Sequence, residues 1–168
     1  MLRLYILLGP VFFHTMEIAM NNKPIYPPTY FLIAIITMLL LHFLLPITNI
    51  VHAPWNLLGI LPLVAGAVIN VMADNLFHRA GTPVKPFEES TALVTVGLYR
   101  LTRNPMYLGF VLILIGVALV CGSLTPFLVV ALFALLMDRR FIAREEQMLA
   151  TKFGAAWQAY QATTRRWI

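Results

Sequence analysis

The stretch that decides the fold is PIYPPTYFLIAIITMLLLHFLLPITNIVHAPWNLLGILPLVAGAVINVMA, residues 24–73, which contains no Asp, Glu, Lys or Arg. A helix rises about 1.5 Å per residue and the hydrocarbon core of a bilayer is about 30 Å thick, so one crossing needs about 20 residues. The stretch is therefore long enough for two membrane crossings. We place them at residues 30–47 and 55–72, with the turn marked by Pro46, Asn49 and Pro54.

A second uncharged stretch covers residues 104–137. As a single helix it would greatly overshoot the bilayer, and the sequence CGSLTP at residues 121–126 supplies a break near its middle. We therefore predict a helical hairpin, formed by residues 105–120 and 126–137.

The composition of the whole chain agrees with a membrane environment. Of 168 residues, 60% are hydrophobic and 11% are charged, whereas a soluble domain is about 25% charged. Residues 4–20 are also apolar, but Gly9-Pro10 interrupts them and His14 and Glu17 are polar. A further crossing, a signal peptide and an interfacial segment all stay open for them.

These segments predict an all-α, polytopic integral membrane bundle with four to five transmembrane helices. We expect one domain over residues 1–168, made of N-terminal helices (1–72), a loop (73–104), the hairpin (105–137) and a tail (138–168). No sequence feature fixes the oligomeric state.

The basic residues indicate the orientation of the chain. The loop carries Arg79, Lys85, Arg100 and Arg103, and six further basic residues follow the hairpin. Because Lys and Arg collect on the cytoplasmic side, we expect the loop and the tail to be cytoplasmic. The net charge of +5 suits anionic lipid headgroups or an anionic ligand, and no nucleic-acid-binding module is present.

The tail has the pattern of an amphipathic helix over residues 139–161. Apolar side chains recur there at helical spacing, while polar ones occupy much of the remaining surface. The recurring residues are Ile142, Leu149, Phe153, Ala156 and Tyr160. We expect Trp157, Tyr160 and Trp167 to anchor this helix at the membrane interface.

The segment RLTRNPMYLG, residues 100–109, opens the predicted hairpin. Asn is a favoured helix N-cap and Pro is favoured at the first helical position, so the helix is expected to begin at Asn104-Pro105. The N–H groups at a helix N-terminus bind carboxylate or phosphate, and Arg100 and Arg103 flank this one. The segment predicts an anion clamp, although arginines at a membrane edge also reach lipid phosphates.

Two adjacent carboxylates in the tail, Glu145 and Glu146, stand out because neither has a basic residue three or four positions away. Glu146 also shares the apolar stripe with Ile142 and Leu149. A carboxylate on an apolar face needs a partner from another part of the chain, so the pair is a candidate functional site.

The sequence gives little support for a metal site, a nucleotide-binding motif or a hydrolase motif. The four histidines lack metal-site spacing, and the chain has no glycine-rich dinucleotide fingerprint, phosphate-binding loop or serine-hydrolase elbow. Lone Cys121 cannot form an internal disulfide. Pairs of glycines seven residues apart, Gly59 with Gly66 and Gly109 with Gly116, are typical of close helix packing in lipid.

Two motifs frame the hairpin: LVTVGLYRLTRNPMYLG, residues 93–109, and REEQMLATKFGAAWQAYQATTRRW, residues 144–167. In this order and spacing they resemble the isoprenylcysteine carboxyl methyltransferase and phospholipid methyltransferase family of integral membrane enzymes. The resemblance covers residues 73–168 and implies S-adenosylmethionine as the methyl donor, bound at the cytoplasmic ends of the last helices.

By motif position, the resemblance assigns cofactor binding to Arg103, Asn104, Pro105, Tyr107, Gly109, Glu145 and Glu146, to which the anion clamp adds Arg100. Arg103 and Glu146 are the candidate catalytic residues, and Glu146 is the first candidate base for an amine acceptor. Asn104 departs from the His that many members carry, which removes any acid or base role at that position. Members that look bacterial also carry Asn, so the cofactor assignment is kept. We expect the protein in a bacterial inner membrane.

The resemblance implies a lipophilic acceptor: a prenylcysteine carboxylate, a phospholipid amine or a small thiol. Two other readings stay open. Integral membrane sterol reductases have a similar hairpin and aromatic tail but use NADPH, and a small helical membrane scaffold would have no cofactor at all.

Overall fold

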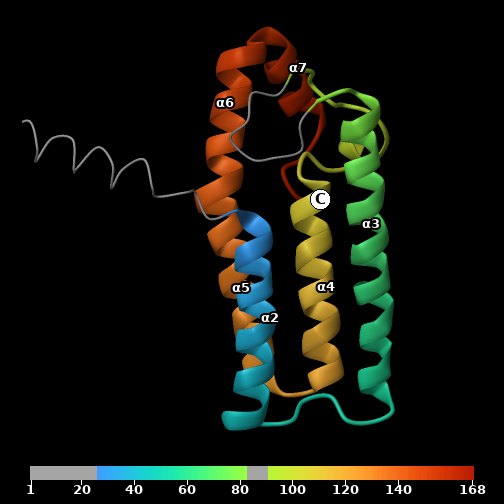
Figure 1. Ribbon diagram of the computed structural model, residues 1–168, viewed down its shortest axis with the longest axis vertical. Coiled ribbons are helices and arrows are strands. Elements are labelled where there is room, and N and C mark those ends of the chain that lie inside the picture. The colour runs from blue at the N-terminus through green and yellow to red at the C-terminus, as the bar shows by residue number, and fades with distance from the viewer. Residues whose placement is uncertain (1–25, 83–90) are drawn as a thin grey trace, which may run out of the picture.

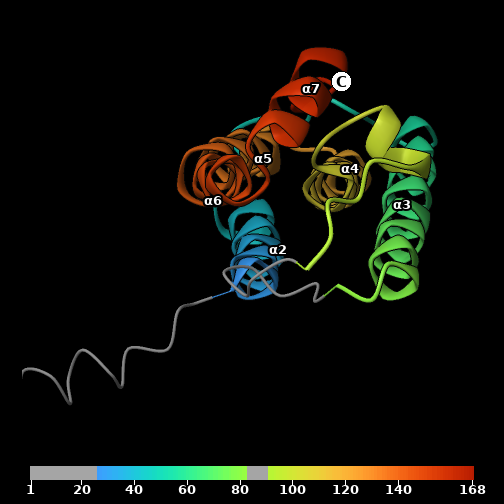
Figure 2. The same cartoon turned by 90° about the horizontal axis from the view of Figure 1, so that it is seen from above.

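Four long helices lie side by side along the long axis of the molecule (Figure 1) in the computed structural model, which describes residues 26–82 and 91–168. They are α2 (Pro27–Leu44), α3 (Ile60–Arg79), α4 (Pro105–Cys121) and α5 (Leu124–Leu136), with one 3₁₀ turn, Trp55–Gly59, leading into α3 and another, Gly97–Arg100, before α4. From above, α4 stands between α3 and the pair formed by α2 and α5 (Figure 2). The described residues contain no strand, so the all-α prediction is confirmed for them.

Two of these helices are long and apolar enough to cross a bilayer: Pro27–Leu44, and Trp55–Arg79 including the 3₁₀ turn. In each of these helices, only 17% of the apolar 18-residue stretch is buried inside the protein. The core helix of a soluble protein is, in contrast, mostly buried. The exposed apolar surface of α2 and α3 therefore suits contact with lipid. The prediction of four to five crossings remains a prediction, and residues 4–20 with His14 and Glu17 lie outside the described residues.

The helix ends follow local sequence, and both helices differ in their bounds from the predicted crossings. Helix α2 begins earlier, at Pro27, because proline is favoured in the first helical turn, and it ends at Leu44, shortly before Pro46. Helix α3 continues to Arg79, beyond the predicted end at residue 72, because no Pro or Gly interrupts the chain before Gly81. The predicted loop is correspondingly shorter.

The hairpin of α4 and α5 forms as predicted, within two residues of the expected ends. Helix α4 begins at Pro105 and ends at Cys121, and Gly122 follows in the left-handed conformation with φ of 75°. Glycine adopts this conformation without a steric penalty, which explains the break in the uncharged stretch.

Glycines bring α3 and α4 into close contact. A Cβ atom on Gly59 would lie 2.5 Å from the Gly116 carbonyl oxygen, and one on Gly66 would lie 2.9 Å from the Ile113 backbone nitrogen. Gly66 also faces Gly109 across the same contact. The two glycine pairs predicted to serve packing therefore meet each other, and they hold α4 against α3.

The tail differs from the single predicted helix 139–161. Helix α5 continues through a π-helical segment, Met137–Ile142, into α6 (Ala143–Phe153), and Gly154 at φ of 49° then separates α6 from α7 (Ala155–Thr163). Glycine adopts such a backbone conformation readily, and the prediction missed the break because the amphipathic pattern continues on both sides of it. Figure 1 shows α6 extending beyond α5 and α7 turning back at the same end of the bundle.

Two of the three predicted interfacial aromatics are in the protein interior. Trp157 and Tyr160 of α7 are 3% and 8% exposed, so the prediction that they anchor the tail in lipid headgroups is wrong for both. Trp167 is half-buried and donates a hydrogen bond from its indole nitrogen to Asp138 at 2.9 Å. The tail thus folds onto the end of the bundle.

Candidate functional site

A cavity of about 1250 Å³ lies where the beginning of α4 meets α6 and α7. Its wall also includes residues at the start of α2, the end of α3 and the segment before α4. Ligand pockets usually measure about 300–1,000 Å³, so this cavity has room for two small ligands or one large one. The polar groups discussed below are in or beside its wall.

Arg103 closes one side of the cavity, with only 9% of its side chain exposed. Its guanidinium donates to Glu146 Oε1 from Nε at 3.1 Å and from one terminal nitrogen at 2.9 Å. The other terminal nitrogen donates to the carbonyl oxygens of Gln161 at 3.2 Å and Thr164 at 2.5 Å. Four of the five N–H donors of the guanidinium are therefore used, and the fifth has no partner among the described residues.

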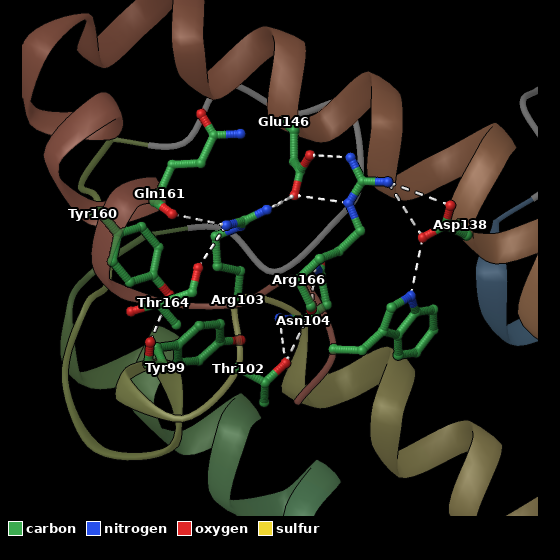
Figure 3. A network of polar contacts seen from close by, with 11 residues as sticks. Tyr99, Thr102, Arg103, Asn104, Asp138, Glu146, Tyr160, Gln161, Thr164 and Arg166 are labelled. Carbon is green, nitrogen blue, oxygen red and sulfur yellow. Dashed lines mark hydrogen bonds and ion pairs between the residues drawn. The ribbon is translucent and has the colours of Figure 1, made fainter.

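Glu146 is held between two arginines (Figure 3). Besides Arg103, Arg166 donates to Glu146 Oε1 at 3.2 Å and to Oε2 at 2.5 Å. Oε1 thus accepts three hydrogen bonds and Oε2 one, and the Glu146 side chain is only 10% exposed. The prediction that this carboxylate needs a partner from elsewhere is thus met twice.

The segment 164–167 ties the tail to the beginning of α4. The Arg103 backbone nitrogen donates to the Arg165 oxygen at 2.9 Å, and Thr102 and Asn104 side chains both donate to the Arg166 oxygen, at 3.1 and 3.0 Å. Arg166 also forms an ion pair with Asp138 at 3.3 Å, and its bonds to Glu146 raise its pKa. The segment therefore fixes α4, α6 and the π-helical segment relative to one another.

Asn104 stands at the N-cap position but does not cap α4 with its side chain. Its amide nitrogen donates instead to Arg166, so the prediction of a side-chain cap is wrong, while the predicted helix start at Pro105 is confirmed. Since no described side chain caps the first turn of α4, the N–H groups of that turn keep their partial positive charge at the cavity wall.

Glu145 is in a different environment from its neighbour. Its Oε1 accepts a hydrogen bond from the Tyr107 hydroxyl at 2.7 Å, and no other hydrogen bond to it is seen within the described ranges. Burial raises the pKa of Glu145 to about 7; the Tyr107 hydrogen bond acts in the opposite direction and the Glu146 charge adds to the rise. This carboxylate is half-buried in the cavity wall and changes its charge near neutral pH.

Aromatic side chains complete the polar end of the cavity. The Arg103 guanidinium carbon lies 5.8 Å from the centroid of the Trp157 ring, within cation–π range. Tyr160 donates from its hydroxyl to the Tyr99 carbonyl oxygen at 2.6 Å, and burial raises the pKa of Tyr160 to about 12. The Trp157 ring thus helps to keep the Arg103 side chain in position.

The cavity wall contains most, but not all, of the site residues expected from sequence. Present are Arg103, Asn104, Pro105, Tyr107, Glu145 and Glu146. Arg100 is exposed and is not part of the wall, so the predicted two-arginine clamp is not formed. Gly109 is also absent from the wall; a Cβ there would meet the Asn70 amide nitrogen at 2.6 Å, so it serves helix packing.

Sequence reasoning missed Arg166 and Asp138, which complete the ion-pair network. Arg166 is 20 residues from Glu146 and comes back to it only because the chain turns at Gly154. The one available signal was the unpaired state of Glu146, which required a distant cation without saying which one.

Comparison with known proteins gives two relatives and one family. Residues 55–156 match the model of the family described as "Phospholipid methyltransferase". Mouse "Delta(14)-sterol reductase TM7SF2" is 35% identical over 83 residues, which is 48% of this chain but 20% of the reductase, so the chain spans about a fifth of that relative. A Haemophilus influenzae protein described as uncharacterized is 40% identical over 63 residues, 38% of this chain and all of that protein. No solved structure matches.

Proposed function

Since the chain belongs to the phospholipid methyltransferase family, a family of membrane methyltransferases, we propose that it transfers a methyl group from S-adenosylmethionine to a lipophilic acceptor. The observation that carries the proposal is the meeting of Arg103, Tyr107 and Glu145 in the wall of one cavity at the polar end of the bundle. These residues come from both sequence motifs that frame the hairpin.

The polar groups of the cavity fit the charged end of this donor. The donor's carboxylate can accept from the uncapped first turn of α4 and from the one available N–H of Arg103. Its sulfonium can lie against the face of the Tyr107 ring, beside Glu145. Glu146 keeps Arg103 in place, because its Oε1 accepts two hydrogen bonds from the Arg103 guanidinium.

The apolar side of the cavity fits a lipophilic acceptor. Pro27, Phe77, Val94, Met106 and Phe110 contribute to its wall, and α2 and α3 carry apolar surface that faces outward. A lipid-soluble acceptor can therefore occupy the apolar side while the donor occupies the polar side. Holding both reactants together in line is the main catalytic requirement for transfer from an already activated donor.

A reductase is the second candidate, favoured by the 35% identity to the mouse sterol reductase over about half of this chain. Arg144 lines the cavity and has no ion-pair partner in the described part of the chain, so it can pair with the phosphate of NADPH. In that case the cavity would be filled by the larger cofactor.

The proposal is tested by two measurements on protein purified in detergent or in membranes. Calorimetric titration with S-adenosylhomocysteine and, separately, with NADPH distinguishes the candidates, and we expect binding of the former only. Membranes incubated with methyl-labelled S-adenosylmethionine should then yield a labelled lipid or small lipophilic molecule by mass spectrometry. Binding of NADPH without any response to S-adenosylhomocysteine would replace the methyltransferase by the reductase.

A further inference from the structure

Two adjacent carboxylates in one cavity wall have opposite surroundings. Glu146 accepts four hydrogen bonds from two arginines, whereas Glu145 accepts one, from an uncharged phenol. Both oxygens of Glu146 are engaged by arginines, with three hydrogen bonds to Oε1 and one to Oε2. When two adjacent carboxylates have such different environments, those environments indicate different chemical roles for them.

Glu145 has the geometry of a proton acceptor. Its Oε1 is fixed by Tyr107 at 2.7 Å, which leaves Oε2 without a hydrogen-bond partner among the described residues. The side chain is half-buried and borders the cavity close to the uncapped end of α4. An oriented carboxylate with one oxygen available can take a proton from a group bound in the cavity.

We propose that Glu145, oriented by Tyr107, removes a proton from the methyl acceptor, and that the acceptor's nucleophilic atom therefore carries a proton, as an ammonium or a thiol does. This inference rests on the proposed methyltransferase function. It gives the role of base to Glu145, in place of Glu146, which the sequence had favoured.

The proton and the electrons balance in this step. The Glu145 carboxylate takes one proton from the acceptor nitrogen or sulfur and becomes neutral, and the lone pair left on that atom forms the bond to the methyl carbon. The bond between that carbon and the donor sulfur breaks, and its electron pair stays on the sulfur. Glu145 then returns its proton to water, which regenerates the carboxylate.

The pH dependence follows from the groups around Glu145. Tyr107 of α4 and Glu146 of α6 act on it most strongly after burial, and the pKa of Glu145 lies at about 7. The other titratable groups of the cavity wall are Tyr26, Tyr99, Arg103, Arg144, Lys152 and Tyr160. A protonated Glu145 cannot accept a proton, so transfer should be lost as the pH falls through about 7. Removing the Tyr107 hydroxyl should move this loss to higher pH, because its hydrogen bond lowers the pKa.

The test uses the full-length protein in mixed micelles with phosphatidylethanolamine or octanethiol as the proton-carrying acceptor. Glu145→Gln keeps an oxygen that accepts from Tyr107 but cannot take a proton. We expect it to lower transfer at least about 10²-fold above neutral pH, the usual contribution of a general base, and to abolish the pH-dependent limb. Ala150→Gln, exposed on the same helix and outside the cavity wall, should leave transfer unchanged.

A second readout does not depend on turnover. Infrared titration should show a protonated carboxyl band that disappears around neutral pH in the wild type, is missing in Glu145→Gln and shifts to higher pH in Tyr107→Phe. S-adenosylhomocysteine affinity should be retained in Glu145→Gln. Loss of that affinity, an unchanged pH profile, or transfer only to the carboxylate of N-acetyl-S-farnesylcysteine would overturn the inference.

The failure of the inference can be separated from the failure of the proposed function. A wild-type protein that binds S-adenosylhomocysteine but transfers methyl groups to neither proton-carrying acceptor contradicts the role of Glu145 alone. A wild-type protein that binds no S-adenosylhomocysteine contradicts the methyltransferase proposal itself.

Discussion

Removing Glu146 should destabilise the protein more than removing Arg103, although the two form one ion pair. Glu146→Ala leaves two guanidinium groups, Arg103 and Arg166, without their shared carboxylate, and the Arg103 side chain is only 9% exposed. Removing one partner of a buried ion pair costs about 3–5 kcal/mol of unfolding free energy. Arg103→Ala leaves Glu146 still paired with Arg166, so its cost should be about 1.5–3 kcal/mol, the range for charged hydrogen bonds.

The assay is denaturant unfolding of the detergent-solubilised protein, followed by tryptophan fluorescence. Asp74→Ala is a matched control, since it removes a carboxylate whose partner, His78, is 69% exposed. An exposed pair contributes at most about 1 kcal/mol, so this variant should unfold almost like the wild type. The reasoning is refuted if Glu146→Ala is no less stable than Asp74→Ala, or if Arg103→Ala is the less stable member of the pair.

Three further outcomes are expected. Arg103→Ala should weaken S-adenosylhomocysteine binding by about 1.5–3 kcal/mol in a calorimetric titration, and unchanged affinity in a folded variant would exclude a direct contact. Gly66→Ala should lower the unfolding free energy by about 1–3 kcal/mol, because its Cβ would lie 2.9 Å from the Ile113 nitrogen, whereas exposed Ala67→Ser should not. A tag after Ile168 should be cleaved only by protease added to the cytoplasmic side, and cleavage from the opposite side would reverse the predicted topology.

Much of the helical layout could be predicted from the uncharged stretches. Their lengths, Pro105 and the Gly122 region placed four helices to within a few residues, apart from the extension of α3 to Arg79. The break at Gly154 could not be placed, because the amphipathic pattern continues across it on both sides. The π-helical segment likewise has no signature in the sequence pattern.

The pairing of Glu146 with Arg103 could be anticipated from the sequence, whereas the rest of the ion-pair network could not. The absence of a helical partner required Glu146 to find a distant cation, and Arg103 was already expected near the same end of the bundle. The identity of the second cation, Arg166, depends on the turn at Gly154, which spacing alone does not reveal. For Asn104 and Arg100, residue type and position suggested roles that the structure does not show. Asn104 was expected to cap α4, but its side chain donates to the Arg166 oxygen. Arg100 was expected in the anion clamp, but its side chain is exposed.

The most direct test of the account is an experimental structure of the protein with S-adenosylhomocysteine bound. The account predicts the ligand in the cavity between the beginning of α4 and α6, with its carboxylate at the first turn of α4 and its sulfur against the Tyr107 ring, beside Glu145. A ligand bound outside this cavity, or one that contacts neither the first turn of α4 nor the Tyr107 ring, would contradict it.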